Sequence, residues 1–203
     1  MKVDPRRLLA IAFTNKVANE MRTRAAKIID AESSFVRVMT FHSWCAYFLR
    51  QEAHVINYPT NYTILDEDDQ LSLVKSVAET LGYKKSDKIV KASLEFLRHQ
   101  KGKGRYPEDV VMPLKHSPEF KEMLRFYKAY EEKKDSMLCF DFDDLLLKTI
   151  YILRTFPDVR AYWANKYDHL LVDEFQDVND IQFELMRYLT RDDSSVYVVG
   201  DPD

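Results

Sequence analysis

Glycine and cysteine are scarce in this chain of 203 residues. None of its four glycines belongs to a G-x-x-x-x-G-K-[ST] sequence, the loop that cradles nucleotide phosphates. The two cysteines, Cys45 and Cys139, are too few for a disulfide framework and favour a reducing compartment, for which we predict the cytoplasm. No apolar run approaches the roughly 20 residues that span a bilayer. The sequence therefore argues against disulfide-rich secreted proteins and membrane proteins.

The residues that are present suit a globular protein, since 46% are hydrophobic and 31% are charged. In residues 1–54, the apolar runs Leu8–Phe13 and Phe35–Met39 each precede a helical pattern. A continuous apolar run is typical of a parallel strand that is covered on both faces. Alternation of such strands with helices predicts βα units in a parallel sheet.

The remaining sequence separates into a helical block and a second α/β block. Residues 55–140 have an almost entirely helical pattern, which we interpret as an inserted all-α domain. Residues 141–203 contain two further apolar strands, His169–Val172 and Ser195–Val199. The predicted fold class is therefore α/β: a partial parallel sheet flanked by helices and interrupted by a helical domain.

Polar clusters follow each of the four predicted strands. In open α/β sheets, ligands bind beyond the carboxyl ends of the strands, so this coincidence is the main physical argument for a functional site. The clusters are Thr14–Lys16, Thr40–Ser43, Asp173–Asp177 and Gly200–Asp203.

The cluster within LLVDEFQD carries the most specific chemistry. An aspartate at the end of an apolar strand can hold Mg²⁺ beside nucleotide phosphates, and an adjacent glutamate can polarise the attacking water. The alternative is a strand end followed by acidic residues that favour a helix N-terminus.

Five segments occur in an order that resembles superfamily 1 DNA helicases of the UvrD/PcrA/Rep type. They are LLAIAFTNKVANEMRTR (motif Ia), VMTFHSWC (motif Ib), FDFDDLL, LLVDEFQDVNDIQ (motif II) and VVGDPD (the opening of motif III). The resemblance implies part of an ATP-dependent 3′–5′ helicase that translocates on single-stranded DNA and unwinds duplexes in repair or replication. It assigns 1–54 and 141–203 to the RecA-like (P-loop NTPase) domain 1A, and 55–140 to the helical insertion 1B.

The same resemblance assigns roles to individual residues. It implies that Asp173 binds the metal and acts with Glu174 in catalysis, and that Gln176, Asp177 and Asp201 belong to the nucleotide site. It also implies a set of DNA-binding residues at motifs Ia and Ib: Phe13, Thr14, Asn15, Lys16, Thr40, Phe41, His42 and Ser43.

The cofactors that the resemblance implies for the whole protein are ATP and Mg²⁺, and the implied partners are single-stranded DNA and junctions of single and double strands. The chain lacks the phosphate loop and the second RecA-like domain of the family. We therefore expect a fragment that needs both as partners, binds no cofactor tightly and is inactive as an ATPase by itself.

Two other functions remain open from the sequence: a non-enzymatic DNA-binding or protein-interaction module derived from a helicase, and a RecB- or AddA-like helicase-nuclease subunit. Residues Lys84–Arg105 include eight Lys or Arg side chains, which form either a solvated helical face or a contact for duplex DNA. The aspartates at 141, 143 and 144 indicate either a metal-nuclease cluster or, more simply, an acidic helix start.

Overall fold

The computed structural model describes residues 3–29, 35–83, 87–112 and 118–201. The chain divides into two compact units. The first comprises residues 1–56 and 148–203, and the second comprises residues 57–147. The later division falls inside a helix, after residue 147, whereas the sequence pattern changes at 140. The assignment of these units to domains 1A and 1B stays a prediction.

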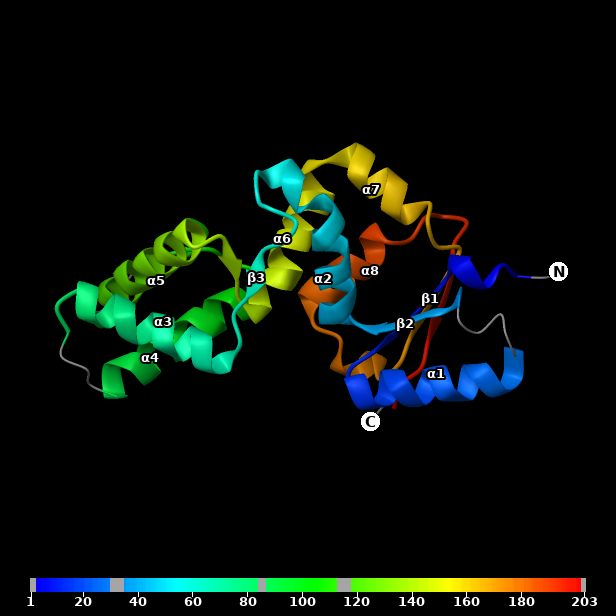
Figure 1. Cartoon of the computed structure of the whole chain (residues 1–203), viewed down its shortest axis with the longest axis horizontal. Helices are drawn as coiled ribbons and strands as arrows, with labels where there is room; N and C mark the ends of the chain where they lie inside the picture. Colours follow the sequence, from blue (N-terminus) through cyan, green and yellow to red (C-terminus); the bar gives the residue numbers. More distant parts are fainter. Residues whose placement is uncertain (1–2, 30–34, 84–86, 113–117, 202–203) are drawn as a thin grey trace. The chain divides into compact units, whose positions relative to one another are not determined.

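A parallel four-stranded sheet forms the centre of the first unit. Its order is β2-β1-β5-β6, and Figure 1 shows these strands running side by side. The strands are β1 (Leu8–Ala12), β2 (Arg37–Thr40), β5 (His169–Val172) and β6 (Ser195–Val198). The predicted α/β class with a parallel sheet is confirmed.

Helices cover both faces of this sheet. Figure 1 shows α1 on one face and α2 and α8 on the other. The helices are α1 (Asn15–Ile29), α2 (Phe41–Glu52), α6 (Phe142–Thr155), α7 (Pro157–Ala164) and α8 (Asp180–Tyr188). Short 3-10 turns add η1 (Pro5–Arg7), η3 (Ala53–Ile56) and η4 (Phe175–Asp177).

Successive side chains of β1 point to opposite faces of the sheet, so this strand contributes to the apolar core on each face. Ala10 and Ala12 pack with Ala18 of α1, and these small side chains let the helix approach the sheet closely. Leu9 and Ile11 point to the opposite face, where both are fully buried. The sequence therefore gives β1 two apolar faces, as a strand inside a covered sheet requires.

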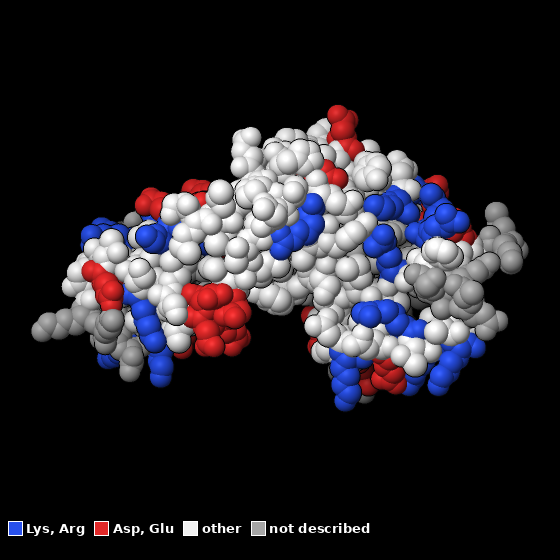
Figure 2. All heavy atoms as spheres, viewed as in Figure 1, with Lys and Arg blue, Asp and Glu red and all other residues white. Residues whose placement is uncertain are grey.

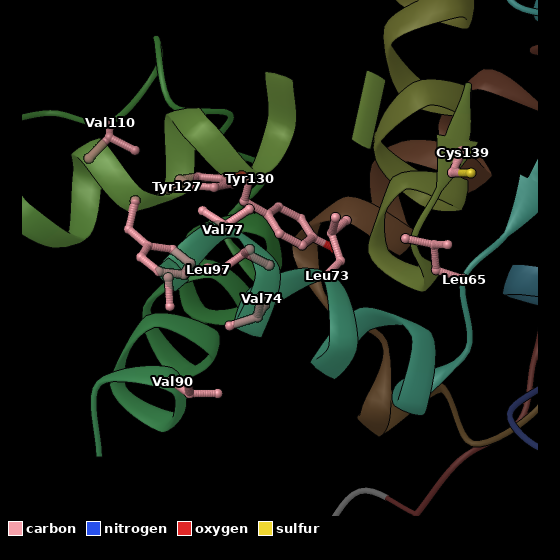
Figure 3. Packing of buried hydrophobic residues seen from close by; sticks show 12 residues of the cluster. Leu65, Leu73, Val74, Val77, Val90, Leu97, Val110, Tyr127, Tyr130 and Cys139 are labelled. Atoms are coloured by element: carbon pink, nitrogen blue, oxygen red, sulfur yellow. The ribbon is translucent and has the colours of Figure 1, made fainter. Parts of the chain in front are cut away.

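The described residues of the second unit form mainly helices, together with a short pair of parallel strands. Its elements are β3 (Thr63–Ile64), α3 (Glu67–Thr80), α4 (Asp87–Gly102), α5 (Pro118–Ser136) and β4 (Cys139–Phe140). Figure 3 shows Val77, Leu97, Tyr127 and Tyr130 packed between the helices. The two-residue strands β3 and β4 were not predicted, because two residues are too few to show the alternation of apolar and polar side chains that is typical of a strand. No helix in the described ranges is long and apolar enough to cross a membrane.

Candidate functional site

The carboxyl ends of all four parallel strands meet at one edge of the sheet. At the end of β1, Ala12 is in register with Thr40 of β2, and Ile11 is in register with Val172 of β5. Val172 is in turn in register with Val198 of β6. The four polar clusters that the sequence places after these strands therefore share this edge, apart from residues 202 and 203, which lie outside the described residues. We call this region the strand-end edge.

Two aromatic residues connect the turns that follow β1 and β2. The rings of Phe13 and Phe41 pack edge to face, with centroids 5.8 Å apart. Phe41 is only 2% exposed, whereas Phe13 is half-buried. Of the two rings, Phe13 is thus the one with a surface that a ligand can reach, and Phe41 supports it from beneath.

Threonine hydroxyls hold the first turns of α1 and α2. The Thr14 Oγ1 accepts a hydrogen bond from the Val17 N–H at 3.2 Å. The Thr40 Oγ1 accepts one from the Ser43 N–H at 3.1 Å and donates to the Ser43 Oγ at 2.8 Å. Both hydroxyls therefore act as helix caps, which fixes the orientation of the turns.

Exposed polar groups complete the start of α1. Asn15 and Lys16 are the first two residues of this helix, and both are exposed. A helix N-terminus presents unpaired N–H groups, and an adjacent lysine adds positive charge. This turn therefore has the chemistry to bind a phosphate oxygen.

His42 occupies the equivalent position near the start of α2, but it is half-buried. Burial lowers the pKa of its imidazole to about 4. The ring is therefore neutral at physiological pH, and it can contribute a hydrogen bond or a packing surface but not a positive charge.

The acidic turn after β5 has an unusual backbone. The Asp173 N–H donates to the Ile11 carbonyl at 3.1 Å, which ties the strand end to β1. Glu174 then adopts a left-handed conformation, with φ 48° and ψ 46°. This conformation costs a non-glycine residue about 1–2 kcal/mol and is enriched at functional sites. It leaves Glu174 exposed and Asp173 half-buried at the strand-end edge.

Gln176 connects this acidic turn to the turn after β6. Its Nε2 donates to the Glu174 Oε2 at 2.6 Å, and its Oε1 accepts from the Asp201 N–H at 3.2 Å. Gly200 allows this approach, because a Cβ there would lie 2.5 Å from the Gln176 Oε1 and 3.1 Å from the Phe175 nitrogen. The sequence analysis did not identify this need for glycine; its signal is a glycine directly after a strand.

The end of the acidic segment is fixed by a capping box at the start of α8. The Gln182 N–H donates to the Asn179 Oδ1 at 2.9 Å, and the Asn179 N–H donates to the Gln182 Oε1 at 3.1 Å. Asp177 is exposed within η4, and its N–H donates to the Glu174 carbonyl at 2.9 Å. Asp173, Glu174 and Asp177 thus offer carboxylate oxygens, the ligands that Mg²⁺ prefers.

The second acidic segment serves a different purpose. Carboxylate oxygens of Glu131, Asp141 and Asp144 lie within 4.8 Å of one another, close enough for a metal ion. However, the Lys101 Nζ lies 2.5 Å from the Asp141 Oδ2 and 2.8 Å from the Asp144 Oδ1, and the Lys134 Nζ lies 2.6 Å from the Glu131 Oε2. We call these five residues the buried ion cluster. Two ammonium groups already form ion pairs with its three carboxylates, so a metal-nuclease site is not supported.

Helix capping explains the same aspartates. The Asp144 N–H donates to the Asp141 Oδ1, and the Asp141 N–H donates to the Asp144 Oδ2, both at 3.0 Å. Burial alone would raise the pKa of Asp144, but the charges of Lys101 and Lys134 hold it well below its usual range. The acidic helix start expected from the sequence is therefore present.

The buried ion cluster also corrects the interpretation of the basic stretch Lys84–Arg105. Lys101 is 1% exposed, so it cannot contact duplex DNA, and its inclusion in that surface was wrong. Lys103 is exposed and Arg105 is half-buried, while Lys84 and Lys85 lie outside the described residues. The remaining side chains stay compatible with either a solvated face or a DNA contact.

Comparison with known proteins identifies relatives over the whole chain. A family model described as the UvrD/REP helicase N-terminal domain matches residues 1–203. The ATP-dependent DNA helicase PcrA of Staphylococcus epidermidis is 32% identical over 203 residues, and PcrA of Staphylococcus aureus is 33% identical. A probable DNA helicase II homolog of Mycoplasma capricolum is 35% identical over 208 residues. The matches cover 99% of this chain but only 27–28% of these relatives.

Proposed function

Because this chain belongs to the UvrD/REP helicase family, we propose that it supplies part of the motor of an ATP-dependent DNA helicase, in which the strand-end edge couples a nucleotide site to a DNA-binding surface. The observation that carries this proposal is the convergence of four polar turns on one sheet edge. The proposed activity of the whole protein is 3′–5′ translocation on single-stranded DNA with unwinding of junctions.

The nucleotide half of the proposed site is the acidic turn. Asp173, half-buried at the end of β5, would hold Mg²⁺, and the exposed Glu174 would orient and deprotonate the attacking water. When bound, Mg²⁺-ATP would supply the phosphoanhydride whose hydrolysis drives the motor. Gln176 would relay changes at Glu174 to the turn after β6, because it hydrogen-bonds both.

The DNA half consists of the turns after β1 and β2. Lys16, Asn15 and the N–H groups of α1 would bind backbone phosphates, and Phe13 would stack on a base, worth roughly 1–3 kcal/mol. Thr40 and Ser43 orient the second turn through their mutual hydrogen bonds. Since β1 lies between β2 and β5, movement of the acidic turn can reach the DNA turns through one strand.

The test is fluorescence anisotropy with a single-stranded oligothymidylate at low salt. We expect Asn15→Ala/Lys16→Ala to weaken binding about tenfold, as loss of a charged hydrogen bond worth about 1.5 kcal/mol predicts. The matched control is Asn19→Ala/Arg24→Ala, which removes the same kinds of side chain from exposed positions of the same helix. Equal affinities for wild type and the first variant would contradict the assignment of DNA to this turn.

ATP hydrolysis by this chain alone provides a second test. We expect turnover no higher than that of Glu174→Gln, because none of its 203 residues forms a glycine-rich phosphate loop. A robust ATPase activity that Glu174→Gln abolishes would show that the chain holds nucleotide phosphates by other means, and would overturn this expectation.

A further inference from the structure

A basic surface that is distinct from the start of α1 lies along β2, the strand at one margin of the sheet. Here the side chains enclose a groove of about 780 Å³, which we call the β2 groove. It is open to solvent and extends from the residues before β1 to Ser43 at the start of α2. The groove thus begins beside a turn to which we assign DNA and continues away from the strand-end edge.

The lining of the β2 groove is strongly cationic. Figure 2 shows Lys and Arg side chains gathered over this part of the first unit, around and above α1. The charged side chains that line the groove are Arg6, Arg7, Arg22, Arg37, Lys166 and a single carboxylate, Asp4. A concave surface with this balance concentrates polyanions, because its walls focus the positive potential.

Only part of this charge is compensated within the protein. Arg7 forms a bidentate ion pair with Asp168, whose pKa the hydrogen bonds from Arg7 and Arg191 lower well below its usual range. For Arg22, Arg37 and Lys166, the structure shows no carboxylate partner among the residues that it describes. These three cations remain available to an external anion.

Aromatic rings hold two of the three cations in place. The Arg37 guanidinium lies 4.4 Å from the centroid of the Tyr47 ring, and the Lys166 ammonium lies 4.1 Å from that of Trp163. Burial alone would raise the pKa of Tyr47, but hydrogen bonding with Gln51 and the charges of Arg37 and Lys166 lower it. The cationic groups are therefore positioned before any ligand binds, which reduces the entropic cost of binding.

The third cation argues against a peptide strand as the ligand. The Arg22 Nε donates to the Val38 carbonyl at 3.2 Å, so it occupies a backbone acceptor of β2. Addition of a strand to a sheet margin requires such acceptors to be free. The β2 groove consequently presents arginine side chains where a β-strand would need to pair.

An exposed ring favours a single strand over a duplex. Phe35 is 50% exposed, and the Arg6 guanidinium lies 5.3 Å from its ring centroid. Single strands bind through cations that contact phosphates and rings that stack on unpaired bases, whereas a duplex keeps its bases stacked internally. Both kinds of group line or border the β2 groove.

We propose that the β2 groove binds the phosphate backbone of single-stranded nucleic acid that continues past Ser43, and so extends the proposed DNA path along the margin of the sheet. This inference rests on the proposed function, which places a strand at the turns after β1 and β2. Arg22, Arg37 and Lys166 contact phosphates, and Phe35 offers a face for a base.

The test compares oligothymidylates of roughly 4 and roughly 16 nucleotides, the limits of common single-strand site sizes. We expect Arg22→Gln/Arg37→Gln/Lys166→Gln to bind the short strand like wild type but to weaken binding of the long strand. The slope of log K against log salt for the long strand becomes shallower by about 2, at about 0.7 per lost phosphate contact. The matched control, Arg24→Gln/Lys27→Gln/Arg187→Gln, removes three exposed cations outside the groove.

The outcomes separate this inference from the proposed function. If Asn15→Ala/Lys16→Ala weakens both strands while the groove variant weakens neither, the β2 groove is not part of the path and only this inference fails. If neither variant changes binding, both fail. If the groove variant loses as much affinity for a blunt duplex as for the long strand, the β2 groove is a general anion-binding surface and the inference is wrong. The same conclusion follows if polyglutamate displaces the long strand from wild type but not from the groove variant. Circular dichroism monitors folding, and Arg22→Gln alone, at an exposed side chain, must reproduce part of the change in slope.

Discussion

The two acidic segments of this protein look alike in sequence but differ in their surroundings. In VDEFQD, Asp173 is half-buried and Glu174 is exposed at the strand-end edge, and no ion pair to either is present among the described residues. In FDFDD, Asp141 and Asp144 are fully buried and contact Lys101 and Lys134. The carboxylates of VDEFQD are therefore available to a ligand, whereas those of FDFDD are paired with lysines inside the protein.

The difference shows that burial and compensation decide what a carboxylate can do. A buried charge needs partners, and once it has them it offers nothing to a metal or nucleotide. An exposed carboxylate on a strained backbone has no such structural explanation. We therefore infer that the strand-end edge is the site and that the buried ion cluster is a stabilising element.

The largest expected effect comes from breaking the buried ion cluster. Lys101→Met leaves Asp141 and Asp144 with one ammonium group, so we expect the free energy of unfolding to fall by about 3–5 kcal/mol. Urea denaturation measures this change. Lys16→Met, at an exposed lysine of the strand-end edge, serves as the control and is expected to change it by less than about 0.5 kcal/mol. Similar effects for the two variants would remove the contrast between the two regions.

The next effect is the pH dependence that His42 confers. Its pKa in the folded state is lowered to about 4, so between pH 6.5 and 4 the unfolded chain binds the proton more strongly than the folded chain does. This contribution to stability is complete above pH 6.5 and declines as the pH falls to 4, by about 3 kcal/mol. Between pH 6.5 and 4, the free energy of unfolding of His42→Gln is therefore expected to fall by about 3 kcal/mol less than that of wild type. Parallel pH profiles of the two proteins would contradict the burial of this imidazole.

A smaller effect follows from adding a methyl group at Gly200. The new Cβ would displace the Gln176 side chain and lie 3.1 Å from the Phe175 nitrogen, so we expect Gly200→Ala to cost about 1 kcal/mol. In a double-mutant cycle, Gln176→Ala should relieve part of this cost because it removes the nearest atom. Strictly additive effects in urea denaturation would show that the two turns do not touch in solution.

The smallest expected effect tests the support of the acidic turn. Asn179→Ala removes the hydrogen bond that the Asn179 Oδ1 accepts from the Gln182 N–H at the start of α8, and should cost about 1 kcal/mol. Thermal unfolding measures it, with the exposed Asp180→Ala as the neighbouring comparison. A loss no greater than that of Asp180→Ala would mean that the capping box contributes little.

The sheet and the convergence of its turns could be predicted because continuous apolar runs identify buried parallel strands. The α7 helix was not predicted from the sequence, because its start is marked by Pro157, and a proline suits both the end of one helix and the first position of the next. The burial of Lys101 was not predictable, because its partners lie 30 to 43 residues away. The same holds for the β2 groove, whose cations come from separate segments, and for the left-handed backbone of Glu174, which depends on its neighbours.

We infer that the strand-end edge of the first unit, and not the buried ion cluster of the second, is the part of the molecule that binds its ligands. The most direct test is an amide NMR titration of the whole chain with a single-stranded oligothymidylate. We predict shift changes in residues 13–16 and 40–43 and none in residues 141–144. Changes confined to the second unit, with the turns after β1 and β2 unaffected, would contradict this account.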